Sequence, residues 1–318
     1  MKVSVVVPCF NAEKWIVETL TSVRGQGIAD LETLVIDDGS TDRSAELVLS
    51  NFPEMRLVRM DRQEGAAQAR NVGIGLSRGM YIQFLDADDL LAPGKLRAQF
   101  EALERSGADI AYGDWQRLEA LGGTGRFERT RIMARRLSER PEVDLFEAFW
   151  CPPAAYLFRR TIVEKAGGFK QRFPVIQDAR FVLDCALAGA RFVHCEGIAA
   201  YYRVHCSGSL STRSTQAFLR DLFNNTSDME TLWTSGGGSL GPEQTRVLIT
   251  HYASIGRSSY EHDRDLFEEC YRALQRLRPG YLPSAPFAFA LAARVLGHRK
   301  AEAVALGFRR LKRRVGAR

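Results

Sequence analysis

Up to about residue 115, short apolar runs alternate with longer stretches in which apolar residues recur at helical spacing. The apolar runs predict strands, most of them apolar enough to be buried on both faces, at residues 3–7, 33–36, 56–59, 81–85 and 109–112. The stretches between them predict helices at residues 12–24, 42–49 and 66–76. Ser40 and Thr41 are candidate N-caps of the second helix. This alternation predicts a doubly wound α/β domain with a mostly parallel sheet.

The rest of the chain loses this rhythm. Residues 122–125, Gly-Gly-Thr-Gly, indicate a loop or turn, because no strand and helix bracket them. We expect mixed strands and helices to about residue 210. Beyond it, breaks at residues 236–238 and at the prolines near 279–286 predict roughly three helical segments. The expected organisation is an α/β domain over residues 1–210 and a helical region over residues 211–318.

The net charge is unevenly distributed. The 318 residues include 44 Lys and Arg and 38 Asp and Glu, which gives a formal net charge of +6. Much of the excess lies at the C-terminal end without an acidic neighbour, at Arg309, Arg310, Lys312, Arg313, Arg314 and Arg318. Because we find no nucleic-acid recognition motif and no zinc framework, we expect no nucleic-acid partner.

The cysteines and the apolar segments bear on the compartment. None of the six cysteines pairs with another at C-x-x-C spacing, which favours reduced thiols in a cytoplasmic protein. The apolar run that follows Lys2 is too short for the core of a signal peptide. No stretch approaches the roughly 20 apolar residues that a bilayer crossing needs. We therefore expect a cytoplasmic protein without a membrane span.

Acidic residues gather where two predicted strands end. The second strand runs into Asp37–Asp42, and the fourth runs into Asp86, Asp88 and Asp89. Taken alone, residues 39–42 are also typical of a turn or a helix cap. Because parallel strands end at one edge of a sheet, both clusters would share a crevice and repel each other without a compensating cation or hydrogen-bond donors. Such carboxylates suit Mg²⁺ or Mn²⁺, which often bind one or two of them together with ligand phosphates.

The motifs that carry this chemistry follow one another in a specific order. They are VVVPCFN at 5–11, VIDDGSTD at 35–42, ARNVG at 69–73, FLDADD at 84–89, GGF at 167–169, QDARF at 177–181 and YRVH at 202–205. Over residues 1–210 this series resembles the family 2 glycosyltransferases. The resemblance implies the GT-A fold, a Rossmann-like sheet with a donor half and an acceptor half, here with a C-terminal helical extension. It also implies a hexosyltransferase that usually inverts the anomeric carbon.

The resemblance assigns roles to four carboxylates. Asp38 matches the residue that hydrogen-bonds the nucleobase. Asp86 and Asp88 match the D-x-D signature, with Asp86 on the nucleotide side and Asp88 as the direct ligand of the divalent metal. A metal there would neutralise the leaving diphosphate and lower the barrier. Asp178 matches the general base that takes the proton of the acceptor hydroxyl, although it could also cap a helix over residues 179–188.

Other residues are expected to surround the donor. Pro8 and Asn11 lie in the first motif and are expected to bind the nucleotide sugar. Weaker candidates for contacts with the diphosphate are Arg70, Arg203 and His205. For His205 this is because a lone His is more often an ordinary hydrogen-bonded residue. The sequence departs from the family pattern before the base, where Gln replaces a frequent Glu and removes a like charge.

Three other functions compete with this interpretation. A phosphoryl-transfer hydrolase could use Asp86 and Asp88, but Leu90 stands where it would have Thr or Val, and Asp37–Asp42 would be unexplained. A dinucleotide oxidoreductase needs G-x-G-x-x-G after the first strand, where this chain has residues 8–11, Pro-Cys-Phe-Asn. A non-catalytic nucleotide-sugar-binding protein stays open because of Gln177, and turnover with and without acceptors discriminates it.

The resemblance also implies the partners. We take a UDP-sugar as the default donor and a saccharide or lipid-linked saccharide as the acceptor, in polysaccharide or cell-envelope biosynthesis.

Near the C-terminal end, an apolar helical stripe flanked by basic residues is predicted by Val304, Phe308, Leu311 and Val315. Such a helix suits peripheral contact with the anionic cytoplasmic face of a membrane, and equally suits docking on the catalytic domain or on a second subunit.

Overall fold

The computed structural model describes residues 2–121, 126–204, 214–235, 239–283 and 287–315, with side chains described up to residue 308. The chain divides into two compact units, Met1–Arg213 and Ser214–Arg318, which are treated separately below. The predicted domain boundary at residues 210 and 211 falls outside the described residues and stays a prediction.

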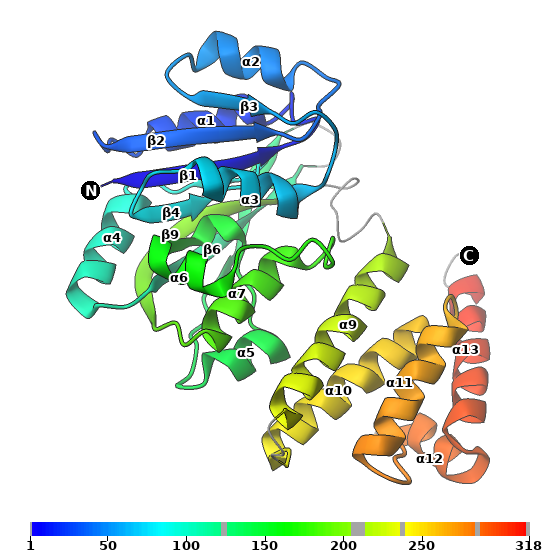
Figure 1. Cartoon of the computed structure of the whole chain (residues 1–318). Coiled ribbons are helices and arrows are strands. Elements are labelled where there is room, and N and C mark those ends of the chain that lie inside the picture. Colours follow the sequence, from blue (N-terminus) through cyan, green and yellow to red (C-terminus); the bar gives the residue numbers. More distant parts are fainter. Residues whose placement is uncertain (1, 122–125, 205–213, 236–238, 284–286, 316–318) are drawn as a thin grey trace. The chain divides into compact units, whose positions relative to one another are not determined.

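The first unit holds the strands and the helices that cover them (Figure 1). Its described strands are β1 Val3–Cys9, β2 Leu31–Asp37, β3 Arg56–Arg59, β4 Tyr81–Phe84, β5 Leu90–Leu91, β6 Ile110–Ala120, β7 Phe127–Met133, β8 Tyr156–Arg159 and β9 Phe192–Val204. Its described helices are α1 Ile16–Arg24, α2 Ser44–Asn51, α3 Ala66–Leu76, α4 Lys95–Ser106, α5 Pro141–Glu147, η1 Pro153–Ala155, α6 Arg160–Ala166 and α7 Gln177–Leu187.

The strands form one sheet in the order β3-β2-β1-β4-β8-β6-β9-β5, and β7 pairs with β6. The half that contains β3, β2, β1 and β4 is parallel throughout. In the other half, β8 is antiparallel to β4 and β6, whereas β9 runs parallel to β6. The predicted α/β fold with a mostly parallel sheet is confirmed, and each described antiparallel pair includes a strand from the region where the sequence loses its rhythm.

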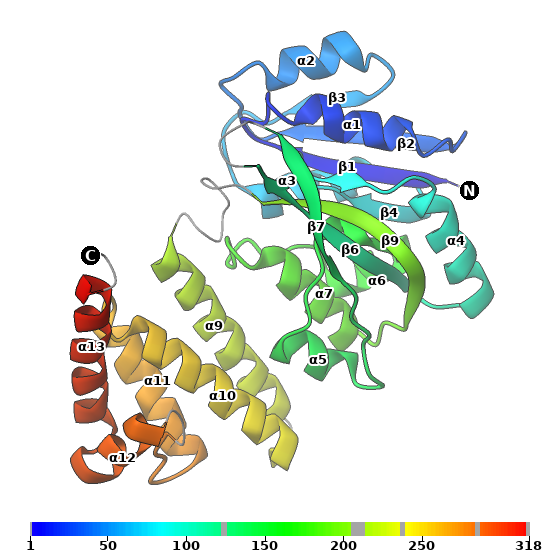
Figure 2. The ribbon, with the colours of Figure 1, turned by 180° about the vertical axis from the view of Figure 1, so that it is seen from behind.

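Both faces of the parallel half are covered, in line with the burial of most residues of β1, β2 and β4. Helix α3 lies over one face in Figure 1, and α1 lies over the other in Figure 2. Val5, Val6 and Val7 of β1 are completely buried between them. Gly73 lets α3 approach closely, because a Cβ at this position would stand 2.2 Å from a methyl carbon of Val6. The helix that carries Arg70 is thereby seated against the sheet.

The N-cap prediction for α2 is wrong. The helix begins at Ser44, and the residue before it has no capping side chain. Ser40 instead accepts a hydrogen bond from the backbone N–H of Asn11 at 3.0 Å. Asp42 accepts one from the backbone N–H of Ser44 at 2.9 Å, so an aspartate turn leads into the helix. By contrast, the strand at residues 56–59 and the helix at residues 66–76 have the predicted bounds.

The second unit is helical, as predicted, but its described part has five helices rather than roughly three. They are α9 Thr215–Thr234, α10 Pro242–Ser259, α11 Arg264–Leu277, α12 Phe287–Leu296 and α13 His298–Val315. Buried side chains of α9, α10 and α11 form a shared core, including Leu219, Tyr252, Ile255 and Leu266. None of the described helices combines the length and the apolar character that a membrane crossing needs.

Two sequence expectations depend on residues beyond this description. The loop predicted at residues 122–125 lies outside the described residues. Five cysteines are free thiols, namely Cys9, Cys151, Cys185, Cys195 and Cys270, and Cys206 lies outside the described residues.

Candidate active site

The acidic turn that follows β4 is held from two sides. Asp89 is 1% exposed, and its Oδ1 accepts a hydrogen bond from the backbone N–H of Arg203 at 2.9 Å. The guanidinium of Arg203 donates to the backbone carbonyl of Asp88 at 2.8 Å. From α1, the hydroxyl of Thr19 donates to the carbonyl of Ala87 at 2.9 Å. The turn therefore has a defined backbone path, which presents its carboxylates at the end of the strand.

The carboxylates of this turn repel one another electrostatically. Burial raises the pKa of Asp89 well above its usual range, and the negative charges of Asp88 and Asp86 raise it further. Burial also raises the pKa of Asp86, helped by the charges of Asp88 and Asp178 and opposed by Arg70. Like charges crowded in this way favour a cation among them.

A divalent cation fits this donor set. Among the residues that the structure describes, no three His, Cys, Asp or Glu side chains form an enclosing metal site of their own. The acidic turn nevertheless offers hard oxygen donors, and Mg²⁺ or Mn²⁺ commonly takes only one or two carboxylates and completes its shell with phosphates and water. The assignment of Asp88 as the ligand of this cation stays a prediction.

Arg70 connects the acidic turn to the helix that carries the predicted base. Its side chain is 2% exposed and lies over the ring of Phe169, 5.2 Å from the centroid. One terminal nitrogen donates to Oδ1 of Asp86, and the other donates to Oε1 of Gln177 at 2.5 Å. The end of β4 and the start of α7 are therefore joined through a single buried cation.

Asp178 is the second residue of α7, and the N-cap position belongs to Ile176. The alternative that Asp178 caps this helix is therefore wrong, because the helix begins before it. Its Oδ2 accepts a hydrogen bond from the indole N–H of Trp150 at 3.1 Å. The carboxylate of Asp178 does not cap the helix, and its charge contributes to the raised pKa of Asp86.

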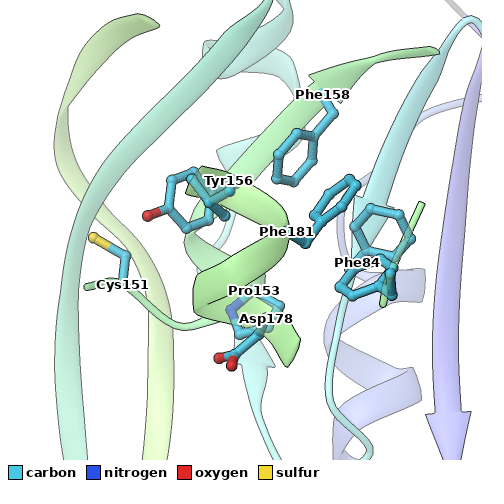
Figure 3. Close-up of a pocket in the computed structure, with 9 residues that line it drawn as sticks. Phe84, Cys151, Pro153, Tyr156, Phe158, Asp178 and Phe181 are labelled. Atoms are coloured by element: carbon cyan, nitrogen blue, oxygen red, sulfur yellow. The ribbon is translucent and has the colours of Figure 1, made fainter. Parts of the chain in front are cut away.

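Aromatic side chains pack behind Asp178. Figure 3 shows its carboxylate beside a small void lined by rings that include Phe84, Phe158 and Phe181. The void measures about 10 Å³, which is room for no more than about one water molecule. It is therefore part of the packing that supports the start of α7, and a sugar would have to bind elsewhere around the carboxylate.

The two carboxylates at the end of β2 hold loops at the same edge of the sheet. Asp38 is 3% exposed, and its two oxygens accept backbone N–H groups of Glu64 at 2.7 Å and Gly65 at 2.9 Å. Asp37 accepts the backbone N–H of Ser40 at 2.9 Å. Each oxygen of Asp38 keeps a second lone pair, so the predicted contact with a nucleobase stays a prediction.

The first motif shapes the neighbouring loop. Pro8 pairs with Ile36 at the end of β1. Asn11 adopts a left-handed backbone conformation, with φ of 50°, and its side-chain oxygen accepts the backbone N–H of Thr41 at 2.9 Å. The loops after β1 and β2 are thereby locked together, and the predicted donor contacts of Pro8 and Asn11 stay predictions.

The side chain of Arg203 is buried against aromatic rings. Its side chain is 1% exposed and donates to Glu18 at 2.7 Å. The guanidinium lies over the rings of Trp15 and Phe127, at 4.5 and 5.1 Å from their centroids. In this conformation it supports the backbone of the acidic turn, and its predicted contact with the diphosphate stays a prediction. His205 lies outside the described residues.

Sequence reasoning missed Trp115 and Trp150 beside Asp178, and it gave Tyr202 no role of its own within the motif at 202–205. Trp115, Trp150 and Tyr202 come from three separate segments and touch one another edge to face. Burial raises the pKa of the Tyr202 phenol, and four negative charges add to it, from Asp89, Asp86, Asp88 and Asp178. The phenol therefore lies among the carboxylates of the site. No regular spacing along the sequence links these three positions. The sequence signal nearest to Trp150 is the irregular stretch before Pro152 and Pro153.

Known proteins share parts of this sequence and fold. The glycosyltransferase GlyG of Streptococcus pneumoniae is 33% identical over 128 residues, which cover 39% of this chain and 42% of GlyG. The succinoglycan biosynthesis protein ExoO of Rhizobium meliloti is 39% identical over 110 residues, covering 34% of this chain and 32% of ExoO. The matched stretches thus span less than half the length of either relative.

Two solved structures share the fold over nearly the whole chain. TarS 1–349 of S. aureus, in complex with UDP-GlcNAc, has a TM-score of 0.60 at 18% identity, covering 98% of this chain and 92% of TarS 1–349. The mannosyltransferase PcManGT of Pyrobaculum calidifontis, in complex with GDP-Man and Mn²⁺, has a TM-score of 0.56 at 19% identity, covering 98% and 87%. Because the model of glycosyl transferase family 2 matches residues 4–167, just over half of the sequence, the chain belongs to glycosyl transferase family 2.

Proposed function

We propose that the chain is an inverting glycosyltransferase that moves a sugar from a nucleoside-diphosphate sugar to an acceptor hydroxyl. The observation that carries this proposal is the bridge made by Arg70, which donates both to Asp86 and to Gln177, the residue before Asp178. The bridge brings a carboxylate turn suited to a metal-bound diphosphate next to a carboxylate that is not part of that turn. A donor-side cluster and a separate base are what a single displacement needs.

In this proposal Asp178 takes the proton from the acceptor hydroxyl as the oxygen attacks the anomeric carbon. Attack from the face opposite the diphosphate inverts that carbon. Asp88 would hold Mg²⁺ or Mn²⁺, and the cation would neutralise the diphosphate as it leaves. Asp86 faces the nucleotide side, and Arg70 holds it in place.

The relatives support a nucleotide-sugar donor without selecting one. TarS was solved with UDP-GlcNAc, and PcManGT was solved with GDP-Man and Mn²⁺. We propose a UDP-sugar, and a saccharide or lipid-linked saccharide as the acceptor. The name of ExoO, a succinoglycan biosynthesis protein, supports a role in making a polysaccharide. We place the reaction at the cytoplasmic face of a membrane, in line with the exposed apolar side chains on α12 and α13.

Binding of the donor tests the first half of the proposal. Melting temperatures of the full chain would be compared with and without UDP-GlcNAc or GDP-Man, each in the presence and absence of Mn²⁺. A ligand at 100 times its Kd stabilises the folded state by about 2.7 kcal/mol, so one donor with Mn²⁺ should raise the melting temperature clearly.

Asp88→Asn is the matched variant for this experiment. It should melt near the wild-type temperature without ligand, because Asn keeps the size of the side chain, and lose the Mn²⁺-dependent part of the donor stabilisation, because it removes the charge that the cation needs. A variant that keeps the full Mn²⁺-dependent shift would remove Asp88 as the metal ligand. Transfer of the sugar to candidate acceptors then separates an enzyme from a protein that only binds the donor.

A further inference from the structure

Trp150 makes a hydrogen bond that the reaction itself does not require. Its indole N–H donates to Oδ2 of Asp178 at 3.1 Å. An indole N–H is a donor only, so this contact favours the carboxylate and occupies one of its two oxygens. The other oxygen, Oδ1, takes no part in this hydrogen bond.

The indole cannot turn freely, because two further rings hold it. Trp115 of β6 meets Trp150 edge to face, with centroids 5.4 Å apart and an interplanar angle of 86°. Tyr202 of β9 meets it at 5.4 Å and 81°. Trp115 and Tyr202 also meet each other, at 5.6 Å and 79°. We call these three mutually perpendicular rings the aromatic clamp.

The aromatic clamp is tied to the donor side through β9. Tyr202 belongs to the clamp, and the next residue, Arg203, donates its backbone N–H to Asp89 and its guanidinium to the carbonyl of Asp88. One strand therefore carries both the support of the acidic turn and a wall of the aromatic clamp. The orientation of the base and the position of the metal-binding turn are set from a common element.

We propose that Trp150 is a positioning residue, which acts through Asp178 by fixing the rotation of its carboxylate so that Oδ1 points at the acceptor hydroxyl. The inference rests on the proposed function, because it assumes that Asp178 is the base. Proton transfer requires the oxygen of the acceptor hydroxyl and Oδ1 of Asp178 to lie within hydrogen-bond distance and in line. A carboxylate that is free to rotate spends less time in this productive orientation. Trp150 touches neither the donor nor the transferred sugar in this proposal.

Removal of the N–H alone tests the proposal. In the full chain, Trp150→Phe keeps an aromatic ring between Trp115 and Tyr202 but removes the donor. We expect kcat to fall roughly 10-fold to 100-fold, while the KM values for donor and acceptor and the melting temperature stay within about twofold and a few degrees. Trp233→Phe, in α9, is the matched control and should keep wild-type kinetics.

A second replacement covers the case in which Trp150→Phe does not fold. Benzothienylalanine at position 150 has the shape of tryptophan with sulfur in place of the N–H, and it should show the same loss of kcat. Wild-type kcat in a folded variant overturns the proposal, and so does a raised acceptor KM with unchanged kcat, which would make Trp150 an acceptor contact.

Failure of the proposed function has a different signature. If Asp178→Asn kept normal turnover, the base would be misassigned whatever Trp150 does. If Asp178→Asn lost turnover and the Trp150 variants did not, only the positioning role would fail.

Discussion

Asp178 owes its place to neighbours rather than to its own helix. The residue before it is held by Arg70, and its own carboxylate is held by Trp150. Arg70 donates to the neutral side chain of Gln177 and to the carboxylate of Asp86. The departure from the family pattern at this position is thus accommodated by a hydrogen bond from Arg70.

Asp178→Asn provides the residue-scale prediction. A placed general base is worth roughly 10²–10⁴ in rate, so turnover should fall on that scale. Affinity for the donor should change little, because the variant leaves the acidic turn and Arg70 intact. Initial rates at saturating acceptor, together with donor titrations by calorimetry, would check both parts. Collapse of donor binding would instead make Asp178 a binding or structural residue.

The junction of α12 and α13 carries a buried histidine. His298 is 8% exposed, and rings of Phe267, Tyr271, Tyr281 and Phe289 surround it at centroid distances of 5.7–6.2 Å. Burial lowers its pKa below the ordinary 6.5. Between the lowered pKa and 6.5 the unfolded chain therefore binds more protons than the folded one.

The element-scale prediction follows from that difference. The contribution of His298 to stability is present above pH 6.5 and is lost as the pH falls below it. The amides of α11, α12 and α13 should then exchange hydrogen faster at pH 5 than at pH 7, after correction for intrinsic exchange rates. His298→Asn should weaken this pH dependence, because it removes the titrating group. An identical pH dependence in the variant would contradict the prediction.

The second unit exposes a set of large apolar side chains. On α12 and α13 these are Phe287 at 82%, Leu291 at 53%, Val295 at 74%, Leu296 at 45%, Val304 at 44% and Phe308 at 69% exposure. The last turns of α13 carry five basic residues without an acidic one. Interfacial helices combine an apolar face with cations, and each basic residue near an anionic surface contributes about 1 kcal/mol. We propose on this basis that the full chain binds the membrane surface through its C-terminal helices.

At the scale of the whole molecule, sedimentation with phosphatidylserine vesicles tests this contact. The double variant Val304→Ser, Phe308→Ser should pellet much less than wild type, and salt should weaken pelleting of both, because screening acts on the charges. Leu49→Ser with Met80→Ser removes two equally exposed apolar side chains from the first unit and should pellet like wild type. Equal pelleting of all three proteins, or of none at low salt, would exclude a membrane role for these helices.

The sequence by itself determined the strands of the parallel half and the chemistry at their ends. These features are local, since a buried strand is apolar along its own length and the residue after it lies at a known edge of the sheet. For this reason β3 and α3 have the predicted bounds, and Asp38, Asp86 and Asp88 lie at the predicted edge.

Only the tertiary structure decided which side chains support those carboxylates. Arg70 and Gln177 are 107 positions apart, and Trp115, Trp150 and Tyr202 come from β6, a loop and β9. Pairs so distant share no periodicity, so no spacing along the chain predicts that they meet. Arg203 illustrates the same limit, because its motif does not predict that its guanidinium lies over Trp15 and Phe127 and donates to the backbone of the acidic turn.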